Sequence, residues 1–571
     1  MSHQVTQRRP ETSVRIIERI YERMSPQAWL VTIVLFGAVV RLAMASHLWG
    51  TDDLNYADLA RIEASTLFGA PPEEFVHNHH SLRKGLVFPV ALLYSLFGVS
   101  DWTTGAFPFV CSLGLIVLAH RFGRLFVSEQ VGLLAAGLMA CFPLSIIFAS
   151  VLWPTEPQAL FVSWAMYLFF KAEKQREGGE TVKATQWLLI GSVLGMAYLI
   201  HITSLFVFLF FGCYLLMWRK RFTWGWGLVV AGVVAFLFAE SFAYYVFHEE
   251  WWYSFKQANR SQNDGLGWGF IVNWEGTSQL IEGTALASFW LGPWSMAALN
   301  QEFALYYIVG LPALAYAAVK HQAMRPLVLW FAVVFLWTAY GTTTPARWIH
   351  LGRMPRYYAV ISLPLMVAVA IFARDLWLKG RTFVAPLGIA GVAVSGLLGA
   401  GLDDGTNTWF ESQFVETVKA EPQTVFATDH HTYSVSLYYD GFSTMLPQMR
   451  VLTQHPDKAF IYKDAHMQVF TGDDPLKGVD AFLFRPESWD YSIRQPENCG
   501  SKDKTGKLDE ACVQQVEKLL DEVRTWGEPE IIASRPRRWL CAPMELVGLS
   551  LGGRLESLCA PRRAYIYRRP R

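Results

Sequence analysis

Long apolar runs separated by short polar connections fill most of the first four hundred residues. A helix needs roughly 20 apolar residues to cross the hydrocarbon core of a bilayer. Runs near that length lie at 28–46, 104–121, 130–150, 155–171, 185–200, 202–218, 224–247, 303–319, 326–342, 355–373 and 382–401. The pattern predicts a mainly α protein, in which residues 28–404 form a polytopic bundle of transmembrane helices with about eleven crossings.

Two further apolar runs, 85–98 and 285–300, are short, and counting 85–98 as a crossing would reverse the orientation of every later loop. Positive charge decides between the two orientations. If 85–98 lies on the outer side without crossing, the basic segments HRFGR, KAEKQREGGETVK, WRKR, KHQAMR and ARDLWLKGR share one side, which the positive-inside rule assigns to the cytoplasm. We therefore predict that both runs are short outer interfacial helices, and that everything after residue 402 is extracytoplasmic.

The two ends of the chain differ from this pattern. Residues 1–27 lack the layout of a secretory signal peptide and place apolar residues on one helical face between Arg and Glu, which predicts an amphipathic segment on the cytoplasmic membrane surface. From residue 405 to 571, short β-like stretches such as TVFAT and AFLFR alternate with polar turns and one helical stretch, DEACVQQVEKLLDEVRTW. This part is expected to be a soluble periplasmic α/β domain.

Four of the seven cysteines lie in this C-terminal part. An even number of cysteines outside the cytoplasm suggests disulfides, most simply Cys499 with Cys512 and Cys541 with Cys559. The alternative is four free thiols, and their spacing resembles no zinc site.

Composition agrees with a membrane protein that carries a soluble part. Hydrophobic residues make up 52% of the chain and charged residues 17%. The formal net charge of +1 gives no overall field that would attract nucleic acid, so no nucleic-acid partner is expected.

Two adjacent carboxylates, Asp52 and Asp53, follow the first apolar run by a few residues, in SHLWGTDDLNYADLA. They are expected at the boundary between membrane and water, where a base could act on a lipid-borne substrate. The alternative is that the pair only marks the point where a helix leaves the bilayer.

The same outer loop continues with His77, His79 and His80. Imidazole is a common metal ligand, but this spacing matches no closed metal site, so polar lining of a substrate cavity is the preferred interpretation and a divalent metal is not indicated. Arg83 could meet a phosphate at the interface, or it could only anchor the following helix by snorkelling.

A short outer loop, GTTTPARWIHLGRMPRYY, carries Arg347, Arg353 and Arg356 and no acidic residue. Short outer loops are normally poor in Arg and Lys, so the three arginines are a candidate functional site. Guanidinium groups bind phosphate oxygens in bidentate fashion, which predicts a lipid phosphate or pyrophosphate as partner. Anchoring to headgroup phosphates is the alternative.

Two polar positions interrupt the apolar spans at other outer turns. Glu156 begins a crossing after a proline-bounded turn, where it could complement the helix dipole or orient a substrate. His201, with Thr203, stands in AYLIHITSLF, and polar groups at such a depth are usually buried against protein or substrate.

Taken in order, TDDLNYADLA, RKGLVFPVALLYSLFG, HRFGRLF, ASVLWPTEPQALF and RMPRYYAVISLPL resemble the GT-C class of integral membrane glycosyltransferases. The resemblance is to bacterial relatives of protein O-mannosyltransferases and lipid A aminoarabinose transferases, and it covers roughly residues 28–375. It implies an enzyme that moves a sugar from a polyprenyl-phosphate carrier to a glycan, lipid or protein acceptor at the outer face, with inversion. No cofactor is implied.

The resemblance also assigns roles to residues. The essential acid of the first outer loop falls on Asp52 or Asp53, the later acidic position on Glu156, and the arginine of an Arg-Tyr motif on Arg356, followed by Tyr357. Where many relatives have a lysine near His201, this chain has none. The expected location is a bacterial inner membrane, with the bilayer itself as a partner.

Two other functions fit parts of the same pattern. A lipid or sugar transporter would also need many apolar crossings, but it predicts ionisable groups near the bilayer midplane and two related halves, and the sequence shows neither. A ligase or polymerase that uses a pyrophosphate-linked oligosaccharide would fit the arginine-rich outer loop almost as well.

Overall fold

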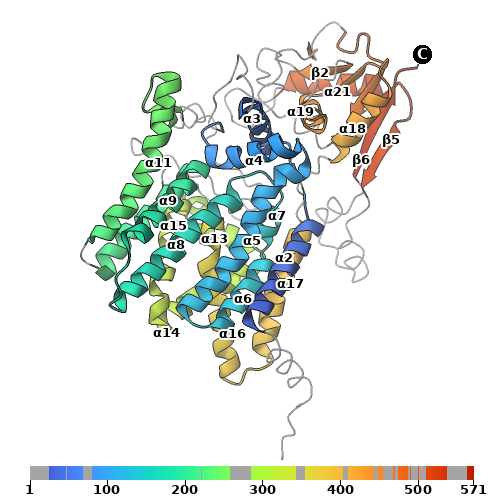
Figure 1. The fold of residues 1–571 in the computed structure, drawn as a ribbon. Helices are drawn as coiled ribbons and strands as arrows, with labels where there is room; N and C mark the ends of the chain where they lie inside the picture. The colour runs from blue at the N-terminus through green and yellow to red at the C-terminus, as the bar shows by residue number, and fades with distance from the viewer. Residues whose placement is uncertain are drawn as a thin grey trace, which may run out of the picture.

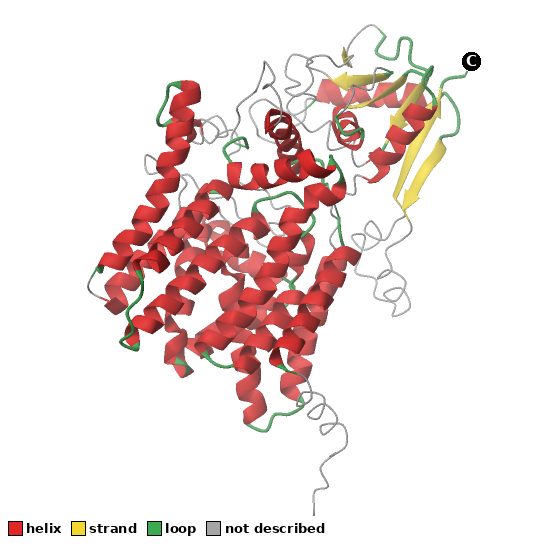
Figure 2. Ribbon diagram, viewed as in Figure 1, coloured by secondary structure: helices red, strands yellow, loops and turns green. Residues whose placement is uncertain are grey.

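The computed structural model has a bundle of apolar helices with a smaller α/β domain at one end of it (Figure 1; Figure 2). The structure describes residues 25–46, 48–67, 80–219, 222–257, 285–341, 354–402, 409–442, 448–453, 467–469, 474–486, 489, 499, 510–535 and 562–570. The predicted segment 1–27 and the cysteines Cys541 and Cys559 lie largely or wholly outside these residues.

The bundle consists of long helices joined by short turns and a few 3-10 or π segments. These elements are α2 Pro26–Ala43, α3 Asp52–Leu67, α4 Lys84–Phe97, α5 Asp101–Phe126, α6 Glu129–Ala140, α7 Pro143–Ile147, α8 Thr155–Glu177, α9 Ala184–Ile200, η1 Ile202–Phe206, α10 Val207–Tyr214, η2 Leu215–Arg219, α11 Trp224–His248, α13 Ala285–Leu299, α14 Tyr306–Lys320, η5 Gln322–Met324, α15 Arg325–Tyr340, η6 Pro355–Ile361, α16 Ser362–Leu378 and α17 Val384–Leu402. Each of the apolar runs predicted to cross the membrane is helical here.

Six helices among the described residues are long and apolar enough to cross a membrane. They are Pro26–Ala43, Asp101–Phe126, Trp224–Val246, Gln322–Tyr340, Pro355–Leu378 and Val384–Gly401. Shorter apolar helices, among them Glu129–Ala140 and Ala184–Ile200, fill other predicted spans. The polytopic helical architecture is therefore confirmed, and the larger number of about eleven crossings stays a prediction.

Capping residues explain where several helices begin. Ser25 caps α2 with its side chain, and Pro26 occupies the first turn, where the missing N–H costs nothing. Ser100 and Thr103 form a reciprocal capping box at the start of α5, directly after Gly98 turns the chain with a φ of +78°. These signals separate the short helix α4 from the long helix α5.

Helices α3 and α4 lie across the end of the bundle that faces the α/β domain (Figure 1). Helix α3 packs against α4, and α4 packs against α5 and α9. This arrangement agrees with the prediction that residues 85–98 form a short helix that does not cross the membrane.

The α/β domain is a three-layer sandwich around a mixed six-stranded sheet with the order β3-β2-β1-β4-β6-β5. Its strands are β1 Phe426–Asp429, β2 Met449–Thr453, β3 Met467–Val469, β4 Ala481–Phe484, β5 Glu530–Arg535 and β6 Arg562–Arg568. Strands β3, β2, β1 and β4 are parallel, and β6 pairs antiparallel with both β4 and β5.

Successive side chains of a strand point to opposite faces, and each face of this sheet packs against its own helices. Phe426 and Ala481 pack with α18 (Trp409–Ala420) and α19 (His430–Tyr439) on one face, whereas Ala427 and Phe482 pack with α21 (Glu510–Arg524) on the other. The strands predicted from TVFAT and AFLFR and the predicted helix are confirmed. The predicted disulfide between Cys499 and Cys512 is also present, and it ties α21 to the preceding chain.

Candidate active site

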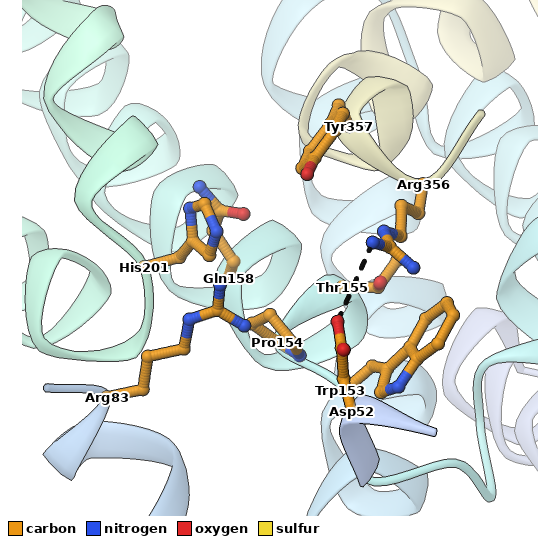
Figure 3. A pocket seen from close by; sticks show the side chains of 9 residues that line it. All are labelled: Asp52, Arg83, Trp153, Pro154, Thr155, Gln158, His201, Arg356 and Tyr357. Atoms are coloured by element: carbon orange, nitrogen blue, oxygen red, sulfur yellow. Dashed lines mark ion pairs between the residues drawn. The ribbon is translucent and has the colours of Figure 1, made fainter. Parts of the chain in front are cut away.

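The two adjacent carboxylates that begin α3 have different surroundings. Asp53 is fully buried, and its carboxylate accepts the backbone N–H groups of Trp49 and Thr51, the latter at 2.7 Å. Burial raises the pKa of Asp53 to about 6. The side chain of Asp52 is 41% exposed and points into a pocket (Figure 3).

This pocket lies where five separate connections of the chain meet. Its lining residues are Asp52, Arg83, Trp153, Pro154, Thr155, Gln158, His201, Arg356 and Tyr357 (Figure 3). They come from the starts of α3, α4, α8, η1 and η6. Since α3 and α4 lie at the end of the bundle next to the α/β domain, the pocket lies at that end too (Figure 1).

The charged groups of the pocket surround Asp52. Nη2 of Arg356 lies 3.9 Å from Oδ2 of Asp52, and Nε2 of His80 lies 3.9 Å from Oδ1. Arg83 lines the opposite wall of the pocket (Figure 3). Burial lowers the pKa of Arg83 to about 10, so this guanidinium stays charged at neutral pH. With two guanidinium groups and one exposed carboxylate, the pocket carries net positive charge.

Aromatic rings hold both guanidinium groups in place. Arg356 lies over the ring of Trp153 at 4.0 Å from its centroid, and Trp153 in turn stacks against Phe148. Arg83 lies over the ring of Tyr56 at 5.1 Å. Stacking on an aromatic face fixes a planar guanidinium and leaves its N–H groups free to bind an anion.

A short hydrogen-bond chain sets the orientation of His201. Nδ1 accepts the backbone N–H of Thr203 and lies 2.7 Å from its hydroxyl, which accepts a hydrogen bond from Nε2 of Gln158 at 2.8 Å. Because Nδ1 is an acceptor, the proton of the neutral ring is on Nε2. His201 therefore offers one oriented N–H donor at the pocket wall.

Most of the predicted site residues that lie within the described part of the chain come together at this pocket. Asp52, Arg83, His201, Arg356 and Tyr357 line the pocket, and His80 lies beside it. Asp53 lies behind it and organises the loop. His77, His79, Arg347 and Arg353 lie outside the described residues.

Glu156 does not line this pocket, although its helix neighbours do. It is 1% exposed and accepts a hydrogen bond from Ser145 at 2.8 Å. Ser145 also accepts from Arg41, whose guanidinium is fully buried in α2. The geometry places Glu156 in a polar network within the bundle.

Sequence reasoning missed Trp153, Thr155 and Gln158, all of which line the pocket. Tryptophan is common at membrane interfaces for packing alone, so Trp153 gave no distinct signal. The polar pair Thr155 and Gln158 near a proline-bounded turn was a usable signal, because both lie at the start of the apolar run 155–171.

Among the residues that the structure describes, no three His, Cys, Asp or Glu side chains gather to hold a metal ion. What the pocket provides is one exposed carboxylate, two fixed cations and an oriented N–H donor. Such a set can accept a proton from one group while it stabilises negative charge on another.

The chain is similar to known proteins in part of its sequence and in its fold. Residues 86–245 match the family described as dolichyl-phosphate-mannose-protein mannosyltransferase. No curated protein matches the chain. The structure of ArnT from Cupriavidus metallidurans bound to undecaprenyl phosphate is 14% identical, with a TM-score of 0.51 over 81% of this chain and 94% of that one. Archaeal oligosaccharyltransferase AglB from Archaeoglobus fulgidus, in complex with an inhibitory peptide and a dolichol-phosphate, is 11% identical, with a TM-score of 0.47 over 80% of this chain and 69% of that one.

The helical bundle and the helices that lie across its end form a GT-C-like fold, which the chain shares with the ArnT structure. The resemblance to GT-C glycosyltransferases that the sequence predicted is confirmed by the family match, and the chain is a multi-pass membrane glycosyltransferase.

Proposed function

We propose that the protein transfers a sugar from a polyprenyl-phosphate carrier to a glycan, lipid or protein acceptor at the outer face of a bacterial inner membrane, with inversion at the anomeric carbon. The observation that carries the proposal is the convergence of Asp52, Arg83 and Arg356 on one pocket. The family match supports a lipid-phosphate-linked donor, and the ArnT structure of similar fold was solved with undecaprenyl phosphate.

In this reaction, Asp52 is the general base. An acceptor hydroxyl is a weak nucleophile, and Asp52 accepts its proton as the new bond from oxygen to the anomeric carbon forms. At the same time, the bond between that carbon and the phosphate oxygen breaks from the opposite side, which inverts the configuration. The side chain of Asp52 is partly exposed to the pocket, whereas both oxygens of Asp53 already accept backbone hydrogen bonds.

The leaving group is the polyprenyl phosphate, which gains negative charge as the bond breaks. Arg83 and Arg356 are fixed against aromatic rings and can stabilise that charge without reorganising. The Nε2–H of His201 provides a further donor to a phosphate or sugar oxygen, at the place where relatives of this class often have a lysine. No cofactor takes part in this scheme.

The position of the pocket supports the outer face as the site of transfer. The α/β domain lies at the same end of the bundle and contains the disulfide between Cys499 and Cys512 (Figure 1). Disulfides persist mainly outside the cytoplasm, so this end of the molecule is expected in the periplasm.

Lipid-linked sugars from cells that lack the protein test the proposal. A monophosphate-linked sugar should accumulate, as detected by mass spectrometry, and wild-type protein should remove it. Asp52→Asn keeps the side-chain shape but cannot accept the proton, so transfer by the purified variant should fall by roughly two to four orders of magnitude.

The matched control is Asp58→Asn on the same helix, because Asp58 pairs with Arg61 and does not line the pocket. It should transfer at close to the wild-type rate. Accumulation of a pyrophosphate-linked oligosaccharide would favour a ligase or polymerase, and near-normal transfer by Asp52→Asn would refute the proposed mechanism.

A further inference from the structure

Helix α19 of the α/β domain contacts the loop that carries Asp52. Nε2 of His431 lies 2.9 Å from the carbonyl oxygen of Gly50, two residues before Asp52. His431 is buried, and burial lowers its pKa to about 3, so the ring is neutral at neutral pH. Since a carbonyl oxygen only accepts, the proton of the neutral ring is on Nε2, which donates a hydrogen bond to the carbonyl oxygen of Gly50.

The backbone of this loop is shaped to receive the histidine. Gly50 has a φ of +76°, a conformation that favours glycine, and a Cβ added there would lie 2.7 Å from Nε2 of His431. Within the loop, Asp53 accepts the N–H groups of Trp49 and Thr51. The loop of residues 49–53 is thus held by Asp53 from the bundle side and by His431 from the α/β domain.

The topology of the sheet explains why α19 reaches this point. Helix α19 begins immediately after β1, and Asp429 caps it by accepting the N–H of Thr432 at 3.0 Å. The strand order reverses direction between β1 and β4, and open α/β sheets bind ligands outside the carboxyl ends of the strands at such a switch point. In this protein, the helix that starts at that edge contacts α3 and its loop instead (Figure 1).

We propose that His431 is a positioning residue, which fixes the loop of residues 49–53 through the Gly50 carbonyl and so holds Asp52 in reach of the acceptor. The α/β domain then contributes a residue that positions the active site. This inference rests on the proposed function, in which Asp52 is the general base. A displacement of about 1 Å at a reacting group can cost about 100-fold in rate.

Two substitutions of similar size separate the N–H donor of His431 from the volume of its ring. His431→Gln keeps a side-chain N–H, whereas His431→Met has none. With full-length protein and the lipid-linked sugar that accumulates in cells lacking it, kcat should fall about 10- to 100-fold for the Met variant and stay within about 3-fold of wild type for the Gln variant. KM for the donor should change by less than about 3-fold in both.

Tyr438→Phe is the matched control at the same interface. The Tyr438 hydroxyl lies 2.7 Å from Oγ1 of Thr104 and donates to Asp101 at 3.0 Å, so its loss weakens domain contact without touching the loop. This variant should keep kcat within about 3-fold of wild type. Equal kcat for the Gln and Met variants, or an equal loss in Tyr438→Phe, would overturn the inference.

Gly50→Ala covers the case in which His431→Met does not accumulate in the membrane. It adds a methyl group against Nε2 without altering the α/β domain, and it should lower kcat by the same 10- to 100-fold. A wild-type kcat in Gly50→Ala would overturn the inference.

The Asp52→Asn background separates this inference from the proposed function. His431→Met should lower the residual rate of Asp52→Asn no further, because its effect passes through the Asp52 carboxylate. A wild-type rate in Asp52→Asn would sink the proposed function. An inactive Asp52→Asn beside a fully active His431→Met would sink only the positioning role.

Discussion

Asp52 and Asp53 are neighbours in the sequence, but their side chains point to different surroundings. Successive residues of a helix are separated by about 100° around its axis, so two adjacent side chains point in different directions. Helix α3 begins at Asp52, which leaves that side chain at the pocket and turns Asp53 toward the backbone of its own loop. One carboxylate can react while the other shapes the backbone around it.

At this scale we predict that Asp53→Asn acts on stability more than Asp52→Asn does. Both oxygens of Asp53 accept hydrogen bonds from backbone N–H groups. In Asp53→Asn, the side-chain NH2 group would replace one of these oxygens, and it cannot accept a hydrogen bond from the N–H group that points at it. The loss should be about 1–3 kcal/mol and should lower the thermal midpoint of the purified protein. Asp52→Asn should leave that midpoint nearly unchanged, and equal midpoints for the two variants would contradict the assignment.

The sequence predicted the acidic pair, Arg83, His201 and Arg356 as site residues, because polar groups at the membrane boundary stand out against apolar runs. It could not separate Asp52 from Asp53, since that depends on which backbone N–H groups the loop turns inward. The contact between Gly50 and His431 joins residues 381 positions apart and leaves no local pattern in the sequence.

At the scale of elements, the packing of α2 against the rest of the bundle depends on a single buried side chain. This helix is 18 residues long, and only Gly37 and Arg41 are buried. Arg41 donates to Ser112 of α5, to the carbonyls of Met139 and Ala140 of α6, and to Ser145 of α7. An arginine near the end of an apolar helix ordinarily snorkels to the interface, so the sequence alone did not indicate that Arg41 turns inward.

We predict that Arg41→Met destabilises the protein and that a second substitution recovers part of the loss. Removing Arg41 takes away the buried guanidinium that is linked to Glu156 through Ser145, and the loss of one charge from such a buried network typically costs about 3–5 kcal/mol. In Arg41→Met with Glu156→Gln, no uncompensated charge remains, so its thermal midpoint should lie between those of wild type and Arg41→Met. A double variant no more stable than Arg41→Met would contradict this account of the network.

At the scale of the whole molecule, the pocket fixes the relative orientation of the helices. Asp52 precedes α4, and Arg356 follows α15, yet their side chains lie 3.9 Å apart. An extra crossing at α4 would place them at opposite ends of the bundle. The helical bundle with its α/β domain was predictable from hydrophobic pattern, whereas the sheet order was not, because it depends on pairing between distant strands.

Labelling of introduced cysteines tests this orientation. Phe97, 73% exposed at the end of α4, and the exposed Gln322, between α14 and α15, lie at opposite ends of the bundle in this arrangement. With Cys213 replaced by Ala, an impermeant thiol reagent outside intact spheroplasts should modify Phe97→Cys. It should modify Gln322→Cys only after the membrane is opened, and the reverse pattern would contradict the proposed topology.

The position of β6 has a consequence for biosynthesis. Strand β6, residues 562–568, lies between β4 and β5 and joins them into one sheet. While the chain grows on the ribosome, β5 therefore has no neighbour in this sheet until those residues have been translated and exported. The helices of the bundle can insert as they emerge, but the partner that holds the Asp52 loop is completed only afterwards. Nascent enzyme in the membrane should thus remain inactive until residues 562–568 have been exported.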